Sequence, residues 1–203
     1  MSPLLLLIPL LDTTALPNRQ GQLSLQTQVG FIIPHAPDLR AIAQSTPVGF
    51  SLEYSRTALS RAAYERCSCF ARVGTYLHYT TFNNAAELGR AVGTGAFFEP
   101  LIRPTNRLFF SVRTTAGLVW LTRVFDRQTN PRNTFFSAPL SGLLALSASA
   151  HVRLGRQMQA SLSASYNHIS NGGTRQPNRG MNYPTLGLGL TYTPRPLPIP
   201  DSR

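Results

Sequence analysis

The chain has 203 residues, enough for one domain with a sizeable core, and its formal net charge is +11. Only 13% of the residues are charged and 42% are hydrophobic, which excludes intrinsic disorder because disorder requires low hydrophobicity and high charge. All 19 basic residues are arginines, scattered along the chain rather than clustered, and this spread argues against a nucleic-acid interface. Scattered arginines are typical of solvated loops and strand ends. The alternative interpretation is that they contact phosphorylated lipid head groups.

Residues 1–15 are predicted to form a signal peptide of atypical composition. The apolar stretch Leu4–Leu11 is followed by Thr13-Thr14-Ala15, which resembles a small-x-small cleavage site, although no basic residue precedes the stretch. Pro9 interrupts it, and it is far shorter than the roughly 18 apolar residues of a membrane-spanning helix. We therefore expect export, cleavage near Ala15, and a single domain over residues 16–203 that ends in a proline-rich tail, residues 194–203.

Beyond this segment, apolar and polar residues alternate with period 2 in segments of about ten residues, the length of a tilted membrane-spanning strand. The clearest is Met158–Ser170, where even positions such as Leu162 are apolar and odd positions such as Ser163 are small and polar. In chain order the predicted strands are Leu23–Phe31, Val48–Ser55, Ala71–Tyr79, Val92–Phe98, Leu108–Trp120, Leu144–Arg153, Met158–Ser170 and Thr185–Tyr192.

Cys67 and Cys69 lie between the second and third predicted strands. Side chains at i and i+2 of an extended segment point to the same side, so a bridge between these two would be strained. The sequence has no CxxC motif and no Cys/His pattern with the spacing of metal ligands, so no metal site is predicted.

A soluble β-sandwich also shows alternation and is one interpretation of the pattern. The polar faces, however, consist of Ser, Thr, Gly and Gln rather than Lys and Glu, as expected for a narrow barrel interior. Aromatic residues gather near strand ends, where interfacial girdles lie; they are Phe31, Tyr54, Tyr79, Phe98, Trp120, Tyr166 and Tyr192. The sequence therefore favours an all-β fold, an eight-stranded antiparallel transmembrane β-barrel of the outer-membrane type.

Connection lengths predict the orientation of this barrel. With both termini periplasmic, the tight turn near Gly155 is periplasmic, and the longer connections at 34–47, 126–133 and 171–183 are external. The connection 55–66 is the exception, because it is long for a periplasmic turn.

Two polar residues, His168 and Ser170, continue the apolar face of the strand that carries Leu162. Polar groups on a lipid-facing surface are costly unless they are shallow or functional. Residues at i and i+2 of a strand lie about 6.8 Å apart, so a leaning imidazole can reach the hydroxyl, as a general base and a nucleophile require. The plainer interpretation is a pair of interfacial polar residues. The loop that follows, 171–184, is rich in Gly and Asn and can direct N–H groups toward a reacting oxygen.

The stretch His168-Ile169-Ser170-Asn171-Gly172-Gly173, followed by Pro177–Asn182 and Pro184–Leu190, resembles the lipid A 3-O-deacylase (PagL, acyloxyacyl hydrolase) family. The resemblance implies an outer-membrane barrel with a serine-hydrolase site on its lipid-facing wall. It implies removal of the ester-linked 3-hydroxyacyl chain from the lipid A of lipopolysaccharide, without a metal or an organic cofactor. The expected partners are lipid A and outer-membrane lipid, with no nucleic acid.

Position by position, the resemblance makes Ser170 the nucleophile and His168 its general base. It places Asn178 and the backbone N–H of Gly173 in the oxyanion hole, with Asn171 nearby.

The acidic triad member of the family falls at Asn182, and no Asp or Glu occurs between Asp126 and Asp201. An amide oxygen can still accept the imidazole N–H, but it supplies no charge to stabilise an imidazolium. The alternative function is therefore a non-catalytic small outer-membrane barrel, a structural or interaction protein whose site has decayed.

Overall fold

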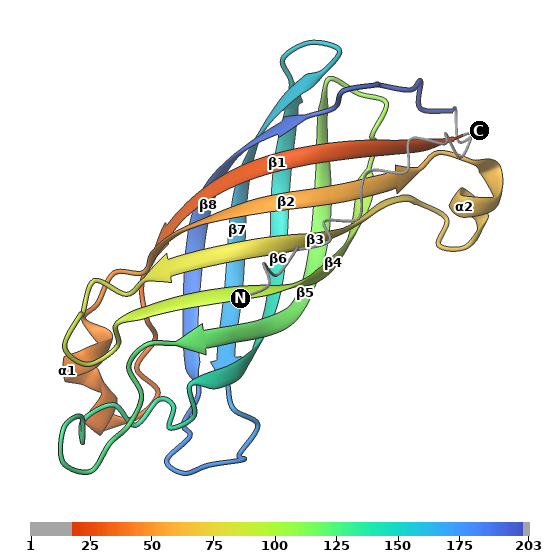
Figure 1. The fold of residues 1–203 in the computed structure, drawn as a ribbon. Helices are drawn as coiled ribbons and strands as arrows, with labels where there is room; N and C mark the ends of the chain where they lie inside the picture. Colours follow the sequence, from red (N-terminus) through yellow and green to blue (C-terminus); the bar gives the residue numbers. More distant parts are fainter. Residues whose placement is uncertain (1–17, 201–203) are drawn as a thin grey trace, which may run out of the picture.

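The computed structural model describes residues 18–200, in which eight strands form a closed antiparallel barrel (Figure 1). Each strand pairs with the next one in sequence, and β8 closes the barrel against β1. The strands are β1 Arg19–Gly30, β2 Val48–Ala58, β3 Phe70–Thr81, β4 Arg90–Ile102, β5 Leu108–Leu121, β6 Leu140–Arg153, β7 Met158–Ser170 and β8 Met181–Tyr192. All eight predicted strands are present, and the fold class is confirmed. The predicted signal peptide, residues 1–15, lies outside the described residues.

The outer wall of the barrel is apolar, as the alternation predicts. Leucines on its outside are about half exposed or more, for example Leu25 at 51%, Leu162 at 56% and Leu188 at 65%. Their neighbours in sequence, such as Ser24 and Ser163, point to the other side of the sheet. Such a wall is stable only against lipid or another apolar phase. No helix within residues 18–200 is long and apolar enough to cross a membrane.

Side chains fill the barrel interior, and an ion-pair network links several strands there. The carboxylate of Glu99 on β4 is fully buried and forms ion pairs with Arg113 Nη2 at 2.8 Å and with Arg72 Nη1 at 3.3 Å. Arg113 also contacts Glu53 of β2 at 2.7 Å, and the Ser111 hydroxyl donates to Glu99 at 2.6 Å. A small barrel is normally filled in this way rather than left open as a pore.

The two ends of the barrel differ. At one end, here called the loop end, lie the long connections 31–47, 82–89, 122–139 and 171–180; the first contains η1 (Pro37–Leu39) and α1 (Arg40–Ala43) (Figure 1). Apolar side chains from these loops form a buried cluster across that mouth; it includes Leu39, Ile42, Phe82, Leu88, Phe135 and Phe136. The loops are therefore a packed layer.

The opposite end, here called the turn end, holds the short connections 103–107 and 154–157 and both described ends of the chain (Figure 1). Within the tail, the Leu197 N–H donates to the Gln20 side chain at 2.8 Å. The long connection predicted at 55–66 does lie at this end. It spans residues 59–69 in the structure because β2 continues to Ala58. It contains α2 (Arg61–Glu65).

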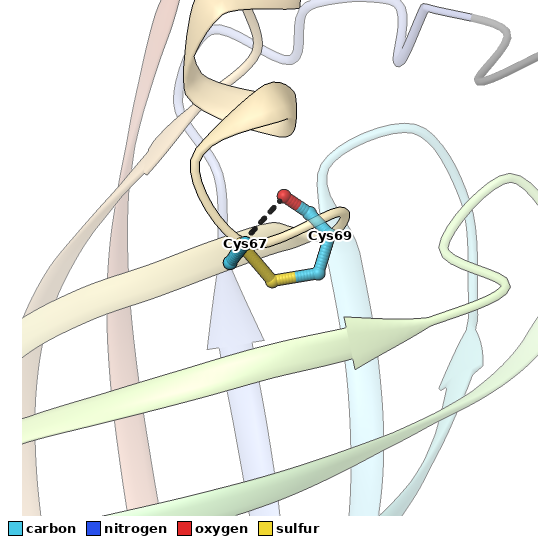
Figure 2. Close-up of a disulfide and its surroundings, with 2 residues drawn as sticks. All are labelled: Cys67 and Cys69. Atoms are coloured by element: carbon cyan, nitrogen blue, oxygen red, sulfur yellow. Dashed lines mark hydrogen bonds between the residues drawn. A yellow bond between two sulfur atoms is a disulfide. The ribbon is translucent and has the colours of Figure 1, made fainter.

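Cys67 and Cys69 form a disulfide in this connection (Figure 2). The strain expected for this bridge presupposed an extended segment. The cysteines instead lie in a turn between α2 and β3, where Ser68 has a left-handed φ of 52°. Their Cα atoms are 5.1 Å apart, well within the range of a disulfide.

Candidate active site

His168 and Ser170 lie at the loop end of β7 on the outside of the barrel, and both are half-buried. The residue between them, Ile169, is fully buried, as the alternation of a strand requires. Across the sheet, Ser170 pairs with Gly142 of β6, and His168 pairs with Asn182 of β8. The register of three strands thus brings together residues that are far apart in the sequence.

The imidazole of His168 is held by Asn182. Nδ1 of His168 lies 2.7 Å from Oδ1 of Asn182. Because an amide oxygen only accepts, this bond places the proton on Nδ1 and leaves the Nε2 lone pair available. The ring edge also lies against Gly180, where a Cβ would come within 2.8 Å of the imidazole Cε1.

Two N–H donors converge on the Ser170 hydroxyl. Asn178 Nδ2 donates to Ser170 Oγ at 3.0 Å, and the backbone N–H of Gly172 does so at 3.2 Å. The side-chain oxygen of Asn178 accepts the Asn171 N–H at 3.3 Å, which orients the amide toward the hydroxyl. Sequence reasoning missed Gly172, whose left-handed backbone, with φ of 65°, turns its N–H back toward the strand end.

The other two predicted oxyanion-hole residues are bonded to each other. The Gly173 N–H donates to Asn171 Oδ1 at 2.9 Å, so it is not directed at Ser170. The buried Asn171 amide also donates to the Arg175 carbonyl at 2.9 Å and to Ser137 Oγ at 3.4 Å. Asn171 therefore fixes the conformation of the loop that carries Asn178.

Neighbouring loops hold this loop in place. Gly180 N–H donates to the Phe135 carbonyl at 2.9 Å, and Ile33 N–H donates to the Asn182 carbonyl at 2.9 Å. The Arg179 guanidinium forms an ion pair with Asp38 at 3.2 Å. The site is therefore built at the junction of the connections 31–47, 122–139 and 171–180.

Within the described part of the chain, no hydrogen bond joins His168 to Ser170. Catalytic hydrogen bonds are often long or poorly aligned before substrate binds, so the lack of this bond does not by itself rule out His168 as a base for Ser170. A hydroxyl, an imidazole with its Nδ1 fixed and two converging N–H donors are the groups from which acyl-transfer sites are built.

A sequence profile of the family described as "Lipid A 3-O-deacylase (PagL)" matches residues 48–191, a range that includes His168, Ser170 and Asn182. The chain belongs to the lipid A 3-O-deacylase family. The predicted family membership is confirmed, and the hydrolase family acts on the lipid A of lipopolysaccharide. No curated protein sequence matches the chain at the significance required.

Solved structures share the barrel at low sequence identity. The structure titled "Crystal structure of the outer membrane enzyme PagL" has a TM-score of 0.59 and 13% identity, covering 82% of this chain and 97% of that chain. The structure of Neisserial surface protein A (NspA) has a TM-score of 0.55 and 10% identity, covering 85% of this chain and 96% of that chain. Family and fold together place the deacylase-family protein in the bacterial outer membrane, as predicted.

Proposed function

We propose that this protein is a serine esterase that removes an ester-linked 3-hydroxyacyl chain from lipid A, with its site on the lipid-facing wall at the outer leaflet. One observation carries the proposal: Ser170 lies on the outer wall, with Asn178 and Gly172 donating to its hydroxyl and His168 on the same face. A lipid that diffuses in the leaflet can present its ester to such a site without leaving the membrane.

The proposed reaction is acyl transfer through Ser170. Oγ attacks the ester carbonyl while Nε2 of His168 takes the hydroxyl proton, and the side-chain N–H of Asn178 and the backbone N–H of Gly172 stabilise the oxyanion. The tetrahedral intermediate collapses, and His168 returns the proton to the departing lipid A hydroxyl. Water then attacks the acyl-enzyme with His168 as the base, which releases the 3-hydroxy fatty acid.

Asn182 orients the imidazole in this proposal and adds no charge beside it. The proton on Nδ1 points at the amide oxygen, so the lone pair that can take the Ser170 proton is on Nε2. An imidazolium formed during attack receives dipolar stabilisation only, and we expect a slower chemical step than a carboxylate would support.

The acyl chain has an open surface beside the nucleophile. Gly142 pairs with Ser170 across β6 and β7, and a Cβ added there would meet, among the described residues, only the Ser170 carbonyl oxygen, at 3.5 Å. Leu140 and Leu144 flank this position and are 54% and 60% exposed. We place the first carbons of the acyl chain over Gly142, between these two leucines.

The test is the lipid A of a bacterial host that expresses the protein. Mass spectrometry should show loss of one hydroxyacyl chain with the native protein and none with Ser170→Ala or His168→Ala, at equal amounts of folded protein. Full deacylation by Ser170→Ala would refute the proposed nucleophile.

The alternative, a non-catalytic barrel, is favoured by one feature, the neutral Asn182 at the position of the acidic triad member. It makes the opposite prediction, that lipid A is unchanged by the native protein and by Asn182→Glu alike.

A further inference from the structure

A second group of functional side chains lies on the outer wall at the turn end, far from Ser170. Arg19 of β1 and Arg56 of β2 are both exposed and occupy outward-facing positions of adjacent strands. Arg56 pairs with Gly21 across the sheet, and Arg19 is two residues from Gly21 on the same face of β1. Neither arginine forms an ion pair with any residue between 18 and 200.

Tyr54 holds the Arg56 side chain in a defined orientation. Nε of Arg56 donates to the Tyr54 hydroxyl at 2.8 Å, and the guanidinium carbon lies 5.5 Å from the centre of the tyrosine ring. The bond occupies Nε and leaves the two terminal nitrogens of the fork for a ligand. A planar guanidinium with a free terminal edge matches the geometry of a phosphate.

Gly21 leaves space between the two arginines. Among residues 18–200, a Cβ built on Gly21 would meet only the Tyr54 side chain, with its hydroxyl oxygen at 3.6 Å. These residues therefore leave the surface over Gly21 open, with Arg56 across the sheet and Arg19 along the strand. Two flexible arginines at these positions can converge on one anion.

The aromatic residues of the wall place this group at head-group depth. Leu23 pairs with Tyr54 on one side and Tyr192 on the other, and Leu23 and Tyr192 are 46% and 41% exposed on the outside. Tyrosines at such positions mark the boundary between hydrocarbon and water. Arg19 and Arg56 lie beyond this level, where phospholipid phosphates are found and where long basic side chains extend to the interface.

We propose that Arg19, Arg56 and Tyr54 form a binding site for the phosphate of an anionic phospholipid in the leaflet at the turn end. That leaflet is the periplasmic one when Ser170 faces the outer leaflet. The site is separate from the deacylation proposed above, and it requires only that the barrel lies in a membrane. An anionic head group such as phosphatidylglycerol fits better than phosphatidylcholine, whose ammonium group adds positive charge beside two arginines.

The experiment is native mass spectrometry of the full-length protein in detergent, titrated with phosphatidylglycerol or with phosphatidylcholine of the same acyl chains. The native protein should bind phosphatidylglycerol more tightly. The double variant Arg19→Gln/Arg56→Gln should weaken that binding about tenfold or more, because charge-assisted hydrogen bonds are lost. Arg56→Lys should weaken it less, since the charge remains and the fork does not. The matched control, Arg123→Gln/Arg127→Gln, removes two exposed loop-end arginines and should leave it unchanged.

Three results would overturn the proposal. The first is equal phosphatidylglycerol binding by the native protein and the double variant. The second is equal binding of the two lipids by the native protein. The third is displacement of the bound lipid by a large molar excess of inorganic phosphate, which would show a general anion site. Faster migration of every variant on unboiled gels verifies that each barrel is folded.

Discussion

At the scale of single residues, the amide of Asn182 is the feature that most affects the proposed chemistry. Asn182→Ala removes the acceptor of the His168 Nδ1 proton and should lower the deacylation rate, though less than Ser170→Ala does. Asn182→Glu should match or exceed the native rate, because a carboxylate stabilises the imidazolium. In a serine protease the reverse change, Asp to Asn, lowers kcat by about 10⁴. Release of 3-hydroxy fatty acid from lipid A in detergent measures all three; an inactive native protein and an inactive Asn182→Glu would contradict the hydrolase.

Gly180 provides a steric test of the imidazole position. Gly180→Ala would place a Cβ 2.8 Å from Cε1 of His168, so the ring must rotate away from Asn182, and activity should fall sharply. Gly173→Ala is the matched control for backbone strain, since Gly173 also has a left-handed φ, of 78°, described neighbours leave open space around it, and its N–H is not directed at Ser170. Each substitution costs about 1–2 kcal/mol because alanine is forced into a left-handed backbone, but only the Cβ at position 180 contacts His168. Equal loss of activity would show that strain, not the displaced ring, is responsible.

Sequence reasoning identified His168, Ser170, Asn178 and Asn182, and the structure brings these four together. The first two follow from alternation along a strand, and the other two from the family resemblance. The pattern could not distinguish Gly172 from Gly173 as the donor to Ser170. That choice depends on backbone angles inside a loop, and alternation contains no information on them.

At the scale of elements, buried ion pairs in the barrel interior connect the strands. Glu99→Gln would leave Arg72 buried without a carboxylate partner and Arg113 with Glu53 alone, and it should lower the free energy of unfolding by about 3–5 kcal/mol. Glu65→Gln removes an exposed partner of Arg61 and should change it by less than about 1 kcal/mol. Urea unfolding in lipid vesicles, followed by tryptophan fluorescence, measures both. Equal effects would mean that the buried network does not stabilise the barrel.

The strands were predictable because each has one apolar and one polar face, and their ends and connections were less so. β2 extends to Ala58 and β6 begins at Leu140, where the alternation is less regular. The loop-end cluster, with Phe135 and Phe136, follows no period and depends on contacts between loops distant in sequence. Loops therefore support the site in a way that strand patterns cannot indicate.

At the scale of the whole molecule, the site and the apolar wall cannot be separated. The buried loop cluster closes one mouth, and an interior of polar and charged side chains fills the barrel. Most of the remaining apolar surface therefore faces outward. An esterase on such a wall meets only substrates that share its membrane, so the fold itself restricts the substrate to lipids.

This arrangement predicts that the protein folds only with detergent or lipid. The outward leucines Leu77, Leu144 and Leu186 are each 60% exposed or more, and water would have to cover them in a soluble monomer. Refolded into detergent micelles, the chain should migrate faster on an unboiled gel than on a boiled one, because the closed barrel stays compact. Ser170→Ala should show the same shift, since the change removes one hydroxyl from the surface and no part of the barrel. A monomer that stays in solution without detergent and shows the same β-sheet signal would contradict a membrane-embedded wall, and with it a site that reaches its substrate through the leaflet.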